Sequence, residues 1–98
     1  MEIKHFATAG TLESSDCLVT LEPSAEGNHI ECSSPVIRQY GEAIRATIED
    51  VLNRLDVHGV KLMLQDKGAL DCTIRSRVQT AVLRAADRTD HLPWGTAL

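Results

Sequence analysis

The chain has 98 residues, of which 43% are hydrophobic and 24% charged, a composition typical of a single folded domain. Its formal net charge of -4 disfavours nucleic acid as a partner, because phosphate binding relies on clustered Lys and Arg. No segment approaches the roughly 20 apolar residues of a membrane-spanning helix, and the first five residues do not resemble a signal peptide. We therefore expect one cytoplasmic domain over residues 1–98, with no membrane partner.

Cysteine and histidine are both scattered along the chain. Cys17, Cys32 and Cys72 form no close pair and leave an odd residue, which indicates reduced thiols rather than a disulfide framework. The histidines lie at positions without the spacing of zinc ligands, so no metal site is expected. They are His5, His29, His58 and His91.

The first part of the chain predicts an arm followed by two strands. Residues 1–16 show no sustained period and are predicted to form an N-terminal arm and a loop. Apolar residues then recur at every second position, at residues 17, 19 and 21 and again at 30 and 32. With the turn-rich residues 23–28 between them, these segments predict a hairpin.

The second part predicts a helix, a strand and a second helix. Ser34 followed by Pro35 is typical of a helix start. The apolar residues that follow recur at three- and four-residue steps. They are Ile37, Tyr40, Ile44, Ile48, Val51, Leu52 and Leu55. Alternation over residues 60–65 predicts a strand, helical spacing returns over residues 70–85, and residues 87–98 are predicted to form a flexible tail.

These elements predict an α+β fold of two layers. Their order is β-β-α-β-α, and a short sheet covered on one face by two helices buries all the apolar stripes together. The pattern leaves the order of the strands in the sheet open.

The candidate chemistry lies in residues 10–16. Ser14 and Ser15 stand between the carboxylates of Glu13 and Asp16, in a segment expected to be exposed. From residue types alone the segment is either a hydrogen-bonded turn or a site where a hydroxyl is modified. The sequence contains neither a glycine-rich phosphate loop nor a nucleophile elbow, so we expect the isolated chain not to be an enzyme.

A basic stripe is predicted on the last helix. Arg77, Arg84 and Arg88 fall near one side of it. The stripe is either a solvated face or a docking site for an anionic cofactor or an acidic partner.

Three segments resemble one family. Residues 9–16, Ala-Gly-Thr-Leu-Glu-Ser-Ser-Asp, resemble the prosthetic-group attachment region of citrate lyase acyl carrier proteins, also called the gamma subunit. Residues 40–45, Tyr-Gly-Glu-Ala-Ile-Arg, and residues 66–72, Asp-Lys-Gly-Ala-Leu-Asp-Cys, resemble two further segments of that family. The resemblance covers nearly the whole chain and weakens in residues 23–28 and after residue 86.

The resemblance implies a non-catalytic carrier. Ser14 would hold phosphoribosyl-dephospho-coenzyme A through a phosphodiester, Ser15 being the less favoured alternative. The thiol of this arm would carry acetyl and citryl thioesters while citrate is cleaved to oxaloacetate and acetate. The implied partners are the transferase (alpha) and lyase (beta) subunits and a prosthetic-group transferase. Glu13 and Asp16 would serve in recognition or in shaping the loop. The competing hypothesis is an unmodified protein–protein interaction or regulatory module.

Overall fold

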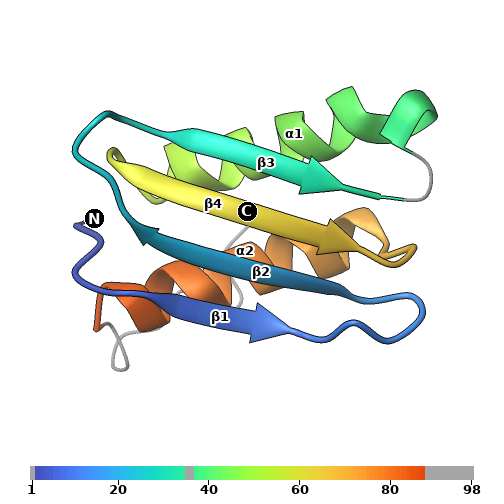
Figure 1. Ribbon diagram of the computed structural model, residues 1–98, viewed down its shortest axis with the longest axis horizontal. Helices are drawn as coiled ribbons and strands as arrows, with labels where there is room; N and C mark the ends of the chain where they lie inside the picture. The colour runs from blue at the N-terminus through green and yellow to red at the C-terminus, as the bar shows by residue number, and fades with distance from the viewer. Residues whose placement is uncertain (1, 35–36, 88–98) are drawn as a thin grey trace.

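The computed structural model describes residues 2–34 and 37–87, which form a four-stranded sheet and two helices (Figure 1). Both helices lie on the same face of the sheet, so the α+β fold predicted from the sequence is confirmed. The elements are β1 (Ala7–Gly10), β2 (Cys17–Pro23), β3 (His29–Ser33), α1 (Ile37–Arg54), β4 (Val60–Asp66) and α2 (Asp71–Ala85).

The strands lie in the order β1-β2-β4-β3. The pairs β1–β2 and β2–β4 are antiparallel, whereas β3 and β4 are parallel. Val19 of β2 and Cys32 of β3 both lie opposite Leu64 of β4. The third segment predicted as a strand is therefore a central strand of the sheet, with a neighbour on each side.

The core lies between the sheet and the helices. In β4, Val60, Leu62 and Leu64 are fully buried while Lys61 and Met63 between them are exposed, as a period of two requires. The helices contribute the other half of the core, including the fully buried Ile48, Val51, Leu52, Val78 and Val82. Each buried Leu, Ile or Val side chain contributes about 1.5–3 kcal/mol relative to exposure.

The structure corrects the predicted N-terminal arm. Residues 7–10 form the edge strand β1, which pairs with β2 from Ala7 opposite Leu21 to Gly10 opposite Leu18. The strand was missed because the only side chains it buries, Ala7 and Ala9, are small and produce a weak apolar alternation.

The predicted hairpin is also wrong. The segments at residues 17–21 and 30–32 are strands, but β4 lies between them and pairs with both. Alternation assigns side chains to a face of the sheet and does not choose the neighbouring strand. Alternate residues of both middle strands, β2 and β4, are buried on the helix-covered face, whereas the edge strand β3 buries none of its residues completely.

Some predictions concern residues beyond the described ranges. Pro35 and residues 88–98 of the tail predicted at 87–98 lie outside them, so these predictions remain untested. The helix that was predicted after Pro35 is present and begins at Ile37. The Ser34 hydroxyl donates to the carboxylate of Asp66 at the end of β4 (2.7 Å).

Candidate functional site

The Ser14 segment is the loop between β1 and β2. It lies at the end of the sheet where β4 ends and α2 begins (Figure 1). Ser14 and Ser15 are the two central residues of a turn in which the Asp16 amide donates to the Glu13 carbonyl (3.2 Å). Both serines are exposed, and within the described residues neither hydroxyl makes a hydrogen bond to another side chain or to the backbone. The geometry therefore presents two free hydroxyls at the tip of a loop.

The base of this loop requires a glycine. Gly10 has a φ of 96°, and a Cβ placed on it would lie 1.9 Å from the carbonyl oxygen of Cys17. No side chain fits so close to a backbone oxygen. Immediately after it, the Thr11 amide donates to that same Cys17 carbonyl (3.1 Å), which closes the loop.

The Asp16 carboxylate holds the loop to α2. Arg77 of α2 donates from Nε to Oδ1 (3.0 Å) and from Nη2 to Oδ2 (2.9 Å), which is a bidentate pair. The Thr11 hydroxyl donates to Oδ2 (2.8 Å) and the Cys17 amide to Oδ1 (2.7 Å). With Arg77 as the main cause, followed by the Cys17 amide and the Thr11 hydroxyl, the pKa of Asp16 is lowered to about 2. The Asp16 side chain is only 13% exposed, so the carboxylate is shielded from solvent.

The loop is also joined to the turn between β4 and α2. The Ser15 amide donates to the Lys67 carbonyl (2.8 Å), and the Lys67 amide donates to the Asp16 carbonyl (2.9 Å). Asp66 shapes this turn by accepting from the amides of Gly68 (3.1 Å) and Ala69 (2.8 Å). Two segments that are distant in sequence thus form one continuous surface around Ser14.

Ser15 and Ser14 differ in their backbone roles. Ser15 has a φ of 65°, in the left-handed region, and its amide is held by Lys67. Ser15 therefore serves to build the turn. The hydroxyl of Ser14, like that of Ser15, is free, so the preference for Ser14 as the attachment residue stays a prediction.

The structure shows contacts for one of the two flanking carboxylates, Asp16, and not for the other, Glu13. The loop-shaping role of Asp16 is confirmed by its four hydrogen bonds. Glu13 is exposed, and its side chain has no partner among the described residues, so its role in recognition stays a prediction.

Neither interpretation of the basic stripe predicted the contacts that its two described arginines make. Arg77 binds Asp16, and Arg84 donates from Nη1 to the carbonyl of Thr8 in β1 (2.8 Å). Both side chains connect α2 to the hairpin formed by β1 and β2. Arg88 lies outside the described residues. The sequence carried no signal for the Asp16–Arg77 pair, because the two residues are 61 positions apart.

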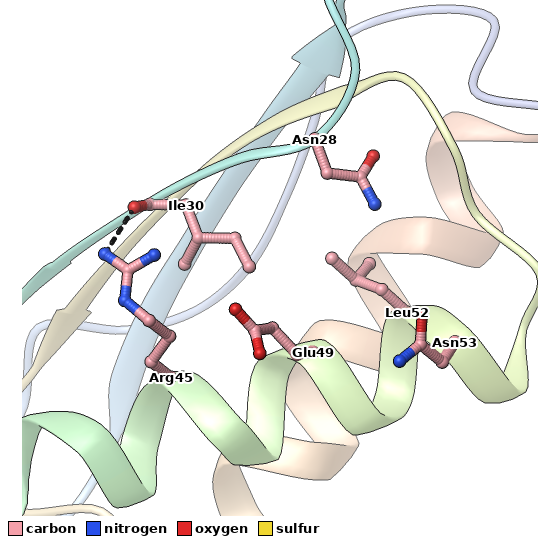
Figure 2. Close-up of a pocket in the computed structure, with 6 residues that line it drawn as sticks. All are labelled: Asn28, Ile30, Arg45, Glu49, Leu52 and Asn53. Atoms are coloured by element: carbon pink, nitrogen blue, oxygen red, sulfur yellow. Dashed lines mark hydrogen bonds between the residues drawn. The ribbon is translucent and has the colours of Figure 1, made fainter.

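A separate hollow lies between β3 and α1, at the opposite edge of the sheet from β1 (Figure 2). Its volume is about 240 Å³. The Asn28 side chain on its rim donates to the Val57 carbonyl and accepts from the amides of Gly59 and Val60. Arg45 donates to the Ile30 carbonyl (2.8 Å) on the outer edge of β3. These polar groups complete local structure, and Arg45 also occupies a backbone acceptor on an edge strand.

Metal ligands do not gather in the part of the chain that the structure describes, where no group of three or more His, Cys, Asp and Glu side chains could hold an ion. His5 contacts Asp87 (2.6 Å) and His58 contacts Asp56 (2.9 Å), while His91 lies outside the described ranges. Over the same residues, neither helix combines the length and hydropathy needed to cross a membrane.

Comparison with known proteins assigns the family. Residues 4–85 match the family described as malonate decarboxylase delta subunit (MdcD). A citrate lyase acyl carrier protein from Edwardsiella ictaluri is 51% identical over 96 residues, which cover 96% of each chain. One from Lacticaseibacillus casei is 53% identical over 87 residues, 89% of this chain and 86% of that protein. The chain belongs to the citrate lyase acyl carrier protein family.

The fold of this citrate lyase acyl carrier family member also occurs inside a larger chain. A crystal structure of a protein from Thermus thermophilus superposes with a TM-score of 0.60 at 15% sequence identity. The match covers 86% of this chain and 16% of that one. At this identity the likeness shows a shared fold alone.

Proposed function

We propose that this chain is the acyl carrier subunit of a citrate lyase and that Ser14 bears its prosthetic group, phosphoribosyl-dephospho-coenzyme A, through a phosphodiester. The observation that carries the proposal is a free, exposed hydroxyl at the tip of a loop held from two sides. The relatives named above, at about half identity over nearly the whole chain, supply the context.

The Ser14 site fits such a group. A bulky substituent on this hydroxyl would displace no hydrogen bond among the described residues, and the side chain already faces solvent. The hydrogen bonds of Asp16 and the Ser15 amide lie behind the tip and would be unaffected. Modification would therefore leave the fold intact.

On this proposal, the chain holds the prosthetic group and its partner subunits perform the catalysis. When bound, the group would supply a thiol whose thioester carries acetyl and citryl units. The chain would position the attachment point, and the transferase (alpha) and lyase (beta) subunits would perform the chemistry. A short tether raises the effective concentration of its end to about mM, which favours transfer between active sites without release. We place this assembly in the cytoplasm.

The decisive experiment is intact mass followed by peptide mapping of chain produced together with its attachment enzymes. The wild-type chain should gain the mass of the prosthetic group on the peptide containing Ser14, and Ser14→Ala should gain none. Ser15→Ala is the matched control, and Ser15→Gly is the better one because glycine accepts the φ of 65° without strain. Both should be modified and should support citrate cleavage.

The outcomes distinguish the two hypotheses. An adduct retained by Ser14→Ala and lost by Ser15→Gly would move the attachment point to Ser15. A wild-type chain that stays unmodified beside active attachment enzymes would instead favour the unmodified interaction or regulatory module.

A further inference from the structure

Exposed apolar side chains lie beside Ser14. Among residues 2–34 and 41–87, whose side chains the structure describes, four large hydrophobic side chains are substantially exposed: Phe6 (57%), Leu12 (52%), Met63 (40%) and Leu70 (69%). Leu12 lies in the β1–β2 loop, two residues before Ser14, and Leu70 ends the turn that precedes α2. That turn is the one whose Lys67 backbone binds Ser15 and Asp16.

The contacts of α2 place this helix beside the Ser14 loop. Arg84 reaches the Thr8 carbonyl of β1, and Arg77, seven residues earlier, reaches Asp16 in the loop. Seven residues are close to two helical turns, so these positions share one side of the helix. Leu70 is the N-cap of α2, with an extended backbone, and stands three residues after Lys67, whose backbone binds Ser15 and Asp16. It therefore lies within about 11 Å of that contact along the backbone. The start of α2, with Leu70, thus lies at the same end of the molecule as the Ser14 loop.

The other two exposed apolar side chains belong to a different surface. Met63 alternates with the buried Leu62 and Leu64 and therefore lies on the face of the sheet that the helices leave open. Phe6 and Met63 together line a hollow of about 150 Å³ there. Of these two exposed apolar areas, the one with Leu12 and Leu70 adjoins the Ser14 loop.

We propose that Leu12 and Leu70 form the docking surface for the enzyme that attaches the prosthetic group to Ser14, an inference that rests on the function proposed above. In the attachment step the Ser14 oxygen forms a bond to a phosphorus of the donor, the bond from that phosphorus to its phosphate or diphosphate leaving group breaks, and the hydroxyl proton is lost. The enzyme that catalyses this step must cover the loop tip, and Leu12 is at most about 7 Å along the backbone from Ser14. Burial of exposed Leu side chains is a principal source of association energy.

The charge of the loop specifies the chemistry of this partner. The Glu13 carboxylate lies between Leu12 and Ser14 and has no partner among the described residues, whereas Asp16 is neutralised by Arg77. An enzyme that presents a phosphorylated donor to Ser14 needs cationic side chains there, and the same cations complement Glu13. The docking partner should therefore have apolar pockets for Leu12 and Leu70, bordered by Lys or Arg side chains.

The loop is prepared for docking by its own contacts. The hydrogen bonds of Asp16 to Arg77 and of Ser15 to Lys67 fix the loop against α2 and against the turn that ends in Leu70. Because little ordering is left to occur on binding, less of the interaction energy is lost to conformational entropy.

The test is the rate of attachment measured by intact mass at several carrier concentrations, with purified attachment enzyme and its donor. Leu12→Ala and Leu70→Ala should each lower kcat/KM by about tenfold, as truncation of an interface anchor does, mainly through KM. Phe6→Ala and Met63→Ala remove comparably exposed apolar side chains and should leave the rate within about twofold. Leu12→Met should restore most of the rate, because it returns apolar area without the original shape.

Each outcome decides between the two proposals. If wild-type chain is modified on Ser14 and the Leu variants match the Phe6 and Met63 controls, the docking surface is refuted and the carrier function stands. Loss of rate in the controls alone would move docking to the open face of the sheet. If wild-type chain is never modified, the carrier function fails and the docking surface fails with it.

Discussion

Replacing Asp16 by Asn tests how far one carboxylate stabilises the attachment loop. Asp16 accepts four hydrogen bonds, two of them from Arg77. Asn has the same size, but its amide nitrogen is a donor and would face a donor of Arg77 or Cys17. The substitution therefore removes the charge and leaves at least one donor without an acceptor.

The expected loss follows from the pKa of Asp16. Its fall from 3.8 to about 2 corresponds to about 2 kcal/mol of stability at neutral pH, since one pKa unit is about 1.4 kcal/mol. For a domain of this size that is a decrease in Tm of about 10 °C. Because the pKa is lower in the folded state, the contribution is present above the unfolded value of 3.8 and is lost as the pH falls towards about 2.

The assay compares urea unfolding of the wild-type chain and Asp16→Asn as a function of pH. The difference in free energy of unfolding should be about 2 kcal/mol at neutral pH, about 1 kcal/mol near pH 3, and a few tenths near pH 2. Asp56→Asn provides a control at an exposed aspartate away from the loop. A difference below about 0.5 kcal/mol at neutral pH, or one that does not vary with pH, would refute the assignment of Asp16 as the residue that holds the loop to α2.

Two further predictions concern the loop base and the thiols. Gly10→Ala should lower the free energy of unfolding by more than about 3 kcal/mol in urea titrations, since its Cβ would meet the Cys17 carbonyl. Gly68→Ala is the control, because Gly68 shares a positive φ but has open space around it, and it should cost about 1 kcal/mol. Equal losses in the two variants would contradict the close approach of Gly10 to Cys17. In alkylation followed by mass spectrometry, exposed Cys72 should react fast in the folded protein, and Cys17, whose pKa burial raises to about 12, should react only on unfolding. Rapid labelling of Cys17 under native conditions would show that the sheet opens near the loop.

Local periodicity determined which segments form the helices and three of the strands. Burial on one face produces the alternation of Val60, Leu62 and Leu64 and the three- and four-residue steps around Ile48 and Val78. These patterns involve residues that are close together in the sequence, so the sequence alone reveals them. The α+β class follows from it, because two amphipathic helices and a one-sided sheet have to cover each other. The segment containing Ser14 was likewise found from its own residues and their resemblance to a family.

Tertiary structure alone decided the neighbours of each strand and the form of the site. Strand β1 buries only two alanines, and its place at the edge depends on pairing with β2 and on the Arg84 contact. The position of β4 between β2 and β3 depends on packing across the whole sheet, which no local pattern contains. The Asp16–Arg77 pair and the backbone contact of Ser15 with Lys67 join residues that lie far apart in the sequence. Residue types could locate the loop, but only the folded chain could hold it, because the groups that hold it come from α2 and the end of β4.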